Sequence, residues 1–514
     1  MKRYVWIVIC FFILLYIGPS LIAPVTQHEC AEAAKAAALF EQGGLAVESL
    51  DRMLSGAALH YCGNNAFGLR IGNILVVALM SIFAMFAIKK CTSDAMTGIM
   101  SALIFFTSFW SFYSPVVPNN QVWGEFFNVL ALGCFFMASR ESRFSMQRIS
   151  LLILCGLLTV MSLLMNGISP FIMSFCIAVI FLLVERKYLD MLLMPVVISV
   201  ITVGFLLLYG HYIRGGWNYE LVVLANDFCA DWKKMEESFS VARLFTNSKV
   251  LLIGIVPSLV FLICAIAGYK GYWKHFFRQS IYRFALIFLL VGIVSVLLNV
   301  TLFLADLPLT ILPYSFLVGA GFVNYMRTRN HFWLLYFLFI IFAFCIIGAS
   351  LWYYCMPQVS LPRNFAFAGF LWGAFIFIGF LSPKTSARMK AYFIGLSVGL
   401  FAAMTAARYK EISSYELETV FAIAVEPSSQ TYEIYATPAM YHVVNFYMND
   451  KNVKLAEVDE NNALNELSDE MEKAAEKKEI VIFAKRGELS PVLLKRAKTL
   501  VHEKFTLHLF AVKK

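Results

Sequence analysis

The side chains that could do chemistry are concentrated in one polar segment, residues 23–70, which lies between two strongly apolar stretches. Thr26-Gln27-His28-Glu29 opens an Ala-rich stretch that ends at Gly43-Gly44, and a second amphipathic stretch runs over residues 47–61. A long helical segment between two membrane spans is typical of one that lies along the membrane surface. An acid-containing helix there is suited to chemistry on a lipid head group, so His28, Glu29 and, at the end of the segment, Arg70 are candidate site residues.

Each of these candidates also has a structural interpretation. Thr26 and Glu29 have the spacing of a capping box, in which the Glu side chain accepts from the backbone of the Thr, and that role alone could explain Glu29. Because capping needs only an acceptor, the sequence predicts that Glu29→Gln keeps the fold. Arg70 could serve only to anchor the start of a span at the interface.

Further candidates lie in other connections that we expect on the same side of the membrane. Glu125 stands about one turn inside a span and follows the polar run Asn119, Asn120 and Gln121. An acid at that depth is costly and therefore informative. Asp306 precedes Pro308 in a tight turn, Arg214 lies in a mixed aromatic and basic run, and Arg363 is the one basic residue of the connection 355–364.

The elements that must position these residues are membrane helices. Of the 514 residues, 60% are hydrophobic and only 15% are charged, with a mean hydropathy of +0.72. That composition excludes an ordinary soluble protein of this size. By length and hydropathy we predict about thirteen spans, near residues 4–22, 71–88, 95–113, 121–138, 149–165, 168–184, 188–209, 249–269, 284–304, 308–326, 332–354, 365–382 and 391–407.

Positive charge alternates between the connections. Basic residues gather at 89–90, 140–148, 186–187, 270–283, 327–329 and 384–390, whereas the short connections between them hold almost none. The positive-inside rule therefore places the amino terminus in the cytoplasm, and residues 23–70, 210–248 and the chain after 407 outside. We expect a multi-pass protein of the bacterial inner membrane with a periplasmic tail.

The tail changes composition and alternates short apolar strands with helices. Strands are predicted at 420–425, 432–436, 453–458, 480–484 and 506–512, and helices at 438–448, 462–476 and 491–503. The sequence thus predicts an all-α polytopic domain over 1–407, with the first outer loop at 23–70 and a second large one at 210–248. It also predicts a small soluble α/β domain over 408–514 with a largely parallel sheet.

Several function classes lack their signals. The sequence has no HExxH, no GxSxG near a base, no P-loop and no GxGxxG in the tail, no nucleic-acid module, and no row of charges through the spans of the kind an ion-coupled transporter uses. We expect no metal cluster, although a metal requirement stays open. The cysteines are scattered; Cys30 and Cys62 bracket the two surface helices, and a disulfide between them is one alternative to free thiols.

Four stretches resemble the polyprenol-phosphate-sugar-dependent glycosyltransferases of the membrane C-type fold, above all the lipid A aminoarabinose transferases and protein O-mannosyltransferases. They are the acidic opening His28-Glu29, the segment Cys62–Arg70, the polar turn Asn119–Gln121 with Glu125-Phe126-Phe127, and Leu307–Pro313. The family has Asp-Glu where this chain has His28-Glu29, and lysines where Ala305 and Asp306 stand.

The resemblance implies transfer of a hexose or pentose from a polyprenyl phosphate, such as undecaprenyl phosphate, to lipid A or lipopolysaccharide, another envelope glycan or a protein. It implies no cofactor, no nucleic-acid partner and a membrane lipid environment. In that scheme Glu29 and His28 are the catalytic candidates, Arg70, Arg214 and Arg363 bind the donor phosphate, and Asn120, Gln121, Glu125 and Asp306 line the pocket. The alternative is a non-catalytic relative that binds a lipid-linked sugar or serves in envelope assembly.

Overall fold

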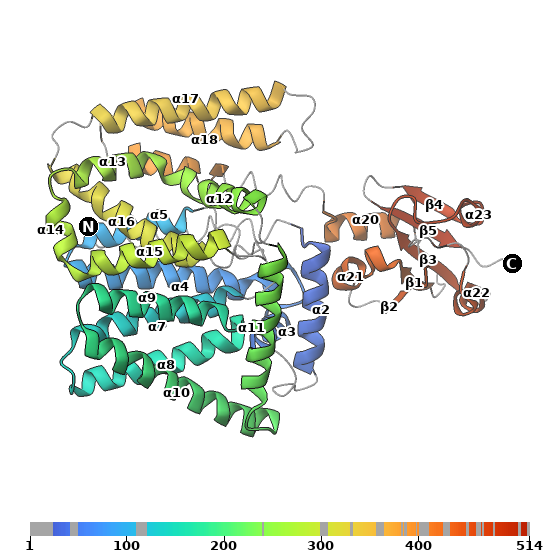
Figure 1. The fold of residues 1–514 in the computed structure, drawn as a ribbon. Helices are drawn as coiled ribbons and strands as arrows, with labels where there is room; N and C mark the ends of the chain where they lie inside the picture. The colour runs from blue at the N-terminus through green and yellow to red at the C-terminus, as the bar shows by residue number, and fades with distance from the viewer. Residues whose placement is uncertain are drawn as a thin grey trace. The chain divides into compact units, whose positions relative to one another are not determined.

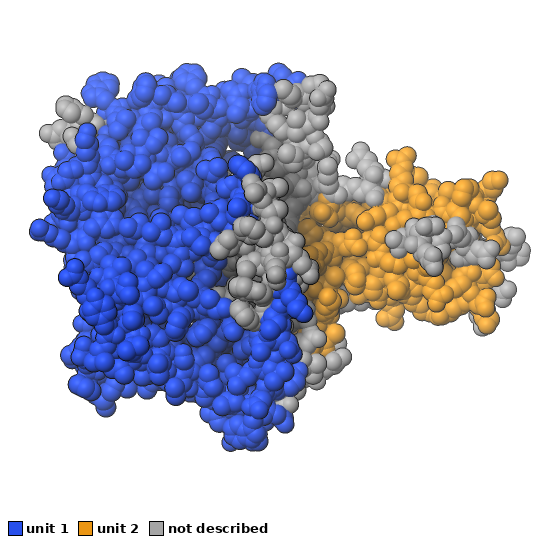
Figure 2. Space-filling model, viewed as in Figure 1, with its two compact units in different colours: residues 1–17, 44–51, 72–403 blue, residues 18–43, 52–71, 404–514 orange. Residues whose placement is uncertain are grey.

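The computed structural model describes residues 24–510, apart from 42–49, 109–110, 112–120, 239–240, 299–306, 329–332, 356–363, 382–383, 385–387, 397, 400–410, 425–431, 449–451, 459–463, 465–466, 476–477 and 502–504. The chain divides into two compact units (Figure 2). Unit 1 comprises residues 1–17, 44–51 and 72–403, and unit 2 comprises residues 18–43, 52–71 and 404–514. Unit 2 therefore combines two segments of the first loop with the tail.

Unit 1 is built from helices, many of them apolar on every side (Figure 1). The helices in its described part are α4 (Ala66–Thr92, whose first residues belong to unit 2), α5 (Ala95–Phe106), α7 (Gln121–Arg140), α8 (Met146–Asn166), α9 (Ser169–Val184), α10 (Tyr188–Arg214), α11 (Tyr219–Ser238), α12 (Val241–Ile255), η2 (Val256–Ser258), α13 (Leu259–Tyr269), α14 (Trp273–Arg278), α15 (Ser280–Leu298), α16 (Leu307–Thr328), α17 (Trp333–Cys355) and α18 (Asn364–Leu381).

Six helices of the described chain are long and apolar enough to cross a membrane, within α4, α7, α8, α10, α15 and α17, and four shorter apolar helices accompany them. The chain is thus a multi-pass membrane protein in composition and helix length. The span predicted over 249–269 is interrupted, because Pro257 in η2 separates α12 from α13. The predicted spans 4–22 and 391–407 lie wholly or partly outside the described residues, so the count of thirteen stays a prediction.

Small residues allow the helices of unit 1 to pack closely. A Cβ on Gly268 of α13 would lie 2.1 Å from the carbonyl oxygen of Gly321 on α16. The two backbones can approach this closely only because neither glycine has a side chain. Close van der Waals packing of this kind stabilises helix contacts in lipid, where the hydrophobic effect does not drive helices together. Helix α17 exposes large apolar residues, among them Phe337, Phe344 and Trp352, as expected of a surface that faces lipid.

At one end of unit 1, ion pairs connect the termini of different helices. Arg148 at the start of α8 bonds Asp190 at the start of α10 (2.9 Å), Arg283 of α15 bonds Glu185 after α9, and Arg327 at the end of α16 bonds Asp94 before α5 (2.9 Å). The connections that the charge pattern assigned to the cytoplasm therefore gather at this end, on the left of unit 1 in Figure 1. Which side of the membrane it faces remains a prediction.

Unit 2 contains a five-stranded sheet of strand order β2-β1-β3-β5-β4. Its strands are β1 (Tyr432–Ala436), β2 (Val453–Leu455), β3 (Glu479–Ala484), β4 (Lys498–Val501) and β5 (Thr506–Phe510), and its helices are α2 (Gln27–Glu41), α3 (Leu50–Cys62), α20 (Ser414–Ala424), α21 (Pro438–Tyr447), α22 (Asp469–Ala475) and α23 (Pro491–Leu494). β1 pairs in parallel with β2 and β3, whereas β5 pairs antiparallel with β3 and β4. The sheet is mixed, so the prediction of a largely parallel sheet is wrong.

The two faces of the sheet bury different clusters. Val481 and Phe483 of β3 pack with residues of α20, α21, α2 and α3, while Ile480 and Ile482 pack on the other face with residues of α22 and α23. This alternation follows from the period of two along a strand. The first-loop helices therefore share a hydrophobic core with the tail, through α2 residues such as Cys30 and Ala33.

Two further predictions for the tail are wrong. The stretch predicted as a strand at 420–425 belongs to helix α20 up to Ala424. Ser413 and Glu416 form a capping box at its start (3.2 and 2.9 Å). The helix then buries Leu417, Val420 and Phe421 on one face. The predicted helix 491–503 ends at Leu494, and the residues that follow form β4, because β5 offers a free edge for pairing. The strand at 432–436 and a helix from Pro438 are confirmed.

Candidate functional site

Glu29 and Arg70 form a buried, bidentate ion pair in unit 2. Arg70 Nε donates to Glu29 Oε1 at 3.0 Å and Arg70 Nη2 donates to Glu29 Oε2 at 3.1 Å. Each side chain is 1% exposed. Arg70 Nη2 also donates to the carbonyl of Pro24 at 3.0 Å. The structure thus brings together the residues that the sequence named first as acid and as cation.

Local sequence explains the start of each helix that carries the pair. Thr26 N donates to Glu29 Oε2 (2.8 Å) and Glu29 N donates to Thr26 Oγ1 (3.1 Å), so the predicted capping box of α2 is confirmed. Before α4, Gly63 has φ +92°, a conformation that favours glycine. Asn65 Oδ1 then accepts from Gly68 N at 2.8 Å. These caps place Glu29 and Arg70 within the first turns of their helices.

The tail supplies contacts to the same segment that sequence reasoning did not assign. The hydroxyl of Tyr447, at the end of α21, accepts from the backbone N–H of Val25 at 2.7 Å, and Asn64 Nδ2 donates to the carbonyl of Phe446 at 3.5 Å. Burial raises the pKa of Tyr447 to about 12, so its hydroxyl stays protonated at neutral pH. The partners of Tyr447 and Phe446 are 422 and 382 residues away in the sequence.

Burial also affects Cys30, which follows Glu29 and belongs to the core shared with the tail. Burial first, and then the neighbouring Glu29 carboxylate, raise the pKa of the Cys30 thiol, so the thiolate is disfavoured. Cys30 and Cys62 are both free, Cys30 buried and Cys62 exposed. The alternative of a disulfide between them is therefore wrong for this structure.

His28 differs from its neighbour in accessibility. It lies on the exposed face of α2, next to Glu29 in sequence, while the Glu29 carboxylate is enclosed by Arg70 and the cap. A base must come within hydrogen-bond reach of the proton that it takes. His28 is thus exposed, whereas the Glu29 carboxylate bonds Arg70 and the backbone N–H of Thr26.

The remaining candidates belong to unit 1 or fall outside the described residues. Glu125 is completely buried in α7 of unit 1, in the helix turn that the sequence predicted. Gln121 and Arg214 are the first residue of α7 and the last of α10, and only their backbone is described. Asn120, Asp306 and Arg363 fall in the segments that the structure does not describe. Their proposed roles stay predictions.

Other buried polar groups accompany Glu125 in unit 1. Asn73 of α4 and Thr310 of α16 are 2% and 3% exposed. Among the described residues, neither Asn73 Oδ1 nor Thr310 Oγ1 has a hydrogen-bond partner. Uncompensated polar atoms in a membrane domain are costly. Sequence reasoning missed these two residues, since a single Asn or Thr in an apolar span gives no pattern.

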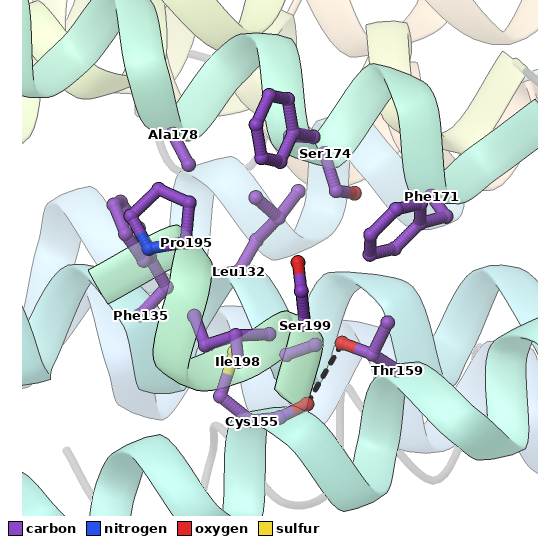
Figure 3. Close-up of a pocket in the computed structure, with 12 residues that line it drawn as sticks. Leu132, Phe135, Cys155, Thr159, Phe171, Ser174, Ala178, Pro195, Ile198 and Ser199 are labelled. Carbon is purple, nitrogen blue, oxygen red and sulfur yellow. Dashed lines mark hydrogen bonds between the residues drawn. The ribbon is translucent and has the colours of Figure 1, made fainter. Parts of the chain in front are cut away.

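A small cavity in unit 1 lies between α7, α8, α9 and α10 (Figure 3). Its volume is about 40 Å³, and Leu132, Phe135 and Ile198 contribute to a mainly apolar lining. Thr159 points its hydroxyl back to the carbonyl of Cys155, to which it donates at 2.8 Å. The size suits a methyl group or one water, so this cavity does not suit a sugar or a phosphate.

Within the described residues, no group of three or more His, Cys, Asp or Glu side chains could hold a metal ion. The described part of the site therefore offers hydrogen-bond and charge chemistry. Whether metal is required stays open, because several polar connections lie in the segments left undescribed.

Comparison with known proteins supports the fold. No protein-family model matches the sequence, and no curated protein matches it. Among solved structures, ArnT from Cupriavidus metallidurans bound to undecaprenyl phosphate matches with a TM-score of 0.70 and 13% identity over 99% of this chain and 98% of that one. The same protein in the apo state matches with a TM-score of 0.65 and 14% identity over the same shares. The membrane C-type fold that the sequence resembles is thereby confirmed.

Proposed function

We propose that this protein is a membrane glycosyltransferase that moves a sugar from a polyprenyl-phosphate carrier to an envelope acceptor. The observation that carries the proposal is the likeness to ArnT over nearly the full length of both chains, including the tail. That structure of ArnT has undecaprenyl phosphate bound, which supports a carrier of the same chemical class here. The apolar helices of unit 1 supply the surroundings that such a lipid needs.

In the proposed reaction, an acceptor oxygen attacks the anomeric carbon of the donor sugar and loses its proton to a base. The bond between that carbon and the phosphate oxygen breaks, and the polyprenyl phosphate leaves with the electron pair. Base assistance contributes roughly 10²–10⁴ in rate. Negative charge on the departing phosphate is best stabilised by cations or N–H donors placed in advance.

We assign the sequence candidates to different roles. We propose His28 as the group that meets the acceptor, since it is exposed and an imidazole is the side chain that most often serves as a general base. We propose Glu29 as the positioning residue that holds Arg70 and the start of α2. Arg214 and Arg363 remain the proposed phosphate ligands, with Asn120, Gln121, Glu125 and Asp306 as proposed pocket residues.

The acceptor class is taken from the family resemblance and the side of action from the charge pattern, and both are part of the proposal. We place the reaction at the periplasmic face of a bacterial inner membrane, with lipid A or lipopolysaccharide, another glycan or a protein hydroxyl as acceptor. The sugar is a hexose or a pentose. No nucleic acid takes part.

A second candidate function is favoured by one specific observation. Both oxygens of Glu29 accept hydrogen bonds from Arg70, and the pair is 1% exposed, so the most obvious acid and cation are bound to each other. A non-catalytic relative that binds a lipid-linked sugar, or serves as an assembly partner, needs no accessible base.

One experiment separates the two functions. The purified full-length protein is incubated with a panel of undecaprenyl-phosphate-linked hexoses and pentoses and with lipid A, and the release of free undecaprenyl phosphate is followed. Release that depends on the acceptor supports the transferase. Saturable binding of a lipid-linked sugar without any release, across the panel, supports the non-catalytic function.

A further inference from the structure

A short helix of unit 1, α14 (Trp273–Arg278), carries exposed basic side chains between two apolar helices. Lys270 precedes it, and Lys274 and Arg278 lie in it; all three are exposed. From Ser238 to Ala305 the sequence contains no Asp or Glu, so this part of the chain holds no acid to neutralise them. We call Lys270, Lys274 and Arg278 the α14 basic patch.

Two acids at the same end of unit 1 are already engaged by arginines outside α14. Glu185 accepts two hydrogen bonds from Arg283, at 2.9 and 3.0 Å, and Asp94 accepts from Arg327 at 2.9 Å. Within the described residues, no ion pair includes a member of the α14 basic patch. The patch therefore presents three uncompensated positive charges.

Aromatic contacts hold α14 in place. The ring of Phe276 lies between Tyr269 and Tyr282, with ring centroids 4.8 and 5.0 Å apart and nearly perpendicular planes. The Tyr269 hydroxyl donates to the carbonyl of Leu317 at 2.6 Å, which ties the end of α13 to α16. Because these contacts anchor the helix on one face, they set the backbone positions from which the basic side chains extend.

The position of α14 along the chain indicates which molecules contact the α14 basic patch. α13 ends at Tyr269 and α15 begins at Ser280, both strongly apolar, so α14 occupies the boundary between hydrocarbon and water. Trp273 is 56% exposed and lies on Phe277 with a centroid distance of 4.4 Å. An exposed Trp beside basic residues is typical of the headgroup region, where the ring sits among glycerol groups and the cations meet phosphates.

We propose that the α14 basic patch, together with Trp273, is a binding surface for anionic phospholipid headgroups of the adjacent leaflet. Charge complementarity selects the partner: three cations are uncompensated and no acid lies in this part of the chain. A zwitterionic headgroup carries a cation beside its phosphate, so its electrostatic attraction to the patch is weaker. This surface is independent of the proposed transfer reaction.

The test uses Trp273 as its own probe. The full-length protein is reconstituted in two kinds of vesicle that contain phosphatidylcholine and phosphatidylglycerol in the same ratio. In one kind the phosphatidylcholine carries bromine near its headgroup, and in the other the phosphatidylglycerol does. The difference in fluorescence between the natural protein and Trp273→Phe isolates the signal of Trp273. We expect brominated phosphatidylglycerol to quench this signal several times more than brominated phosphatidylcholine, and added salt to reduce the difference.

Charge variants test whether the α14 basic patch causes the preference for phosphatidylglycerol. The triple variant Lys270→Gln, Lys274→Gln, Arg278→Gln is expected to reduce the preference for phosphatidylglycerol at least about fivefold, roughly what one charge near a membrane surface contributes. A matched control changes three exposed basic residues of the tail, Lys485, Arg486 and Lys495, to Gln and should keep the preference.

The proposal is overturned if both brominated lipids quench the Trp273 signal equally, or if the α14 and tail variants lose the preference equally. If the triple variant fails to fold, the pair Lys274→Gln and Lys274→Arg replaces it. The Arg variant should keep the preference for phosphatidylglycerol and the Gln variant should lower it; equal behaviour of the two contradicts a charge-based site.

Discussion

Arg70 and Glu29 face each other across 41 residues of sequence with two parallel hydrogen bonds, 3.0 and 3.1 Å long, and both side chains are withdrawn from solvent. The pair joins the first turn of α2 to the start of α4. Removing one partner of such a pair leaves a buried charge without compensation, which typically costs about 3–5 kcal/mol.

This relationship changes the expectation for Glu29→Gln. The sequence predicted tolerance, because Gln can still cap α2; the structure predicts that the free energy of unfolding of unit 2 falls by about 3–5 kcal/mol, since Arg70 loses its anion. Denaturant unfolding of the full-length protein in detergent measures this. Glu32→Gln on the same helix is the control, because its pair with Lys35 is partly solvated and should contribute less than about 1 kcal/mol.

A double-mutant cycle with Arg70→Met identifies the interaction itself. The combined variant should lose less stability than the sum of the two single variants, by about 1 kcal/mol or more, since neither charge is then left alone. Simple additivity of the two changes would show that the pair does not interact in the folded protein.

Replacing His28 with Gln tests the proposed base. The side chain is exposed, so the melting temperature should stay within about a degree or two of the natural protein, as surface changes have small effects. Transfer from the lipid-linked donor should fall by roughly 10²-fold or more, the usual contribution of a general base. Gln27→Ala, one residue earlier, serves as control; full transfer activity in His28→Gln removes His28 from the mechanism.

Tyr447→Phe removes the acceptor of the Val25 N–H and leaves that buried donor unsatisfied. Such a loss costs about 1–3 kcal/mol. Hydrogen exchange of the residues at the start of α2 should accelerate, because the tail no longer holds them. Tyr441→Phe on the same helix is the matched control, and the same exchange rates in both variants would argue against a stabilising role for the Tyr447 hydroxyl.

His508 makes unit 2 sensitive to acid. Its ring nitrogens bond the hydroxyls of Thr499 and Thr506, and burial lowers its pKa to about 4. In the unfolded chain its pKa is about 6.5, so the unfolded state binds more protons between these values and stability falls as the pH drops from about 6.5 to 4. The full loss, from a shift of about 2.5 pKa units at about 1.4 kcal/mol each, is at most about 3.5 kcal/mol. Hydrogen exchange of β4 and β5 across this pH range measures it, and His508→Gln should flatten the dependence.

The orientation can be tested through Cys62, which is exposed, and Cys30, which is buried. With residues 23–70 outside, a membrane-impermeant maleimide added to intact spheroplasts should label the natural protein more than Cys62→Ser, while Cys30→Ser should make no difference. A reporter fused after residue 407 should be active only if it is of the periplasmic type. Activity of a cytoplasmic reporter there would reverse the predicted topology.

The sequence by itself determined the local features, because these depend on neighbours along the chain. The capping box of Thr26 and Glu29, the two surface helices and strand β1 all follow from hydrogen bonding within a turn or from periodic burial. Apolar length likewise predicted the six described helices that are long and apolar enough to cross a membrane. The resemblance in four short stretches was enough to indicate the fold, although each stretch is weak alone.

Only the tertiary structure decided which of these features meet. The partner of Glu29 is 41 residues away and that of Val25 is 422 residues away, and no periodicity encodes either distance. The pairing of β4 with β5, which made the sheet mixed, depended on an available strand edge rather than on the propensity of residues 498–501. Burial of Glu29 was decided in the same way: a carboxylate that the sequence offers as a base becomes, once Arg70 packs against it, a charge held by its neighbour.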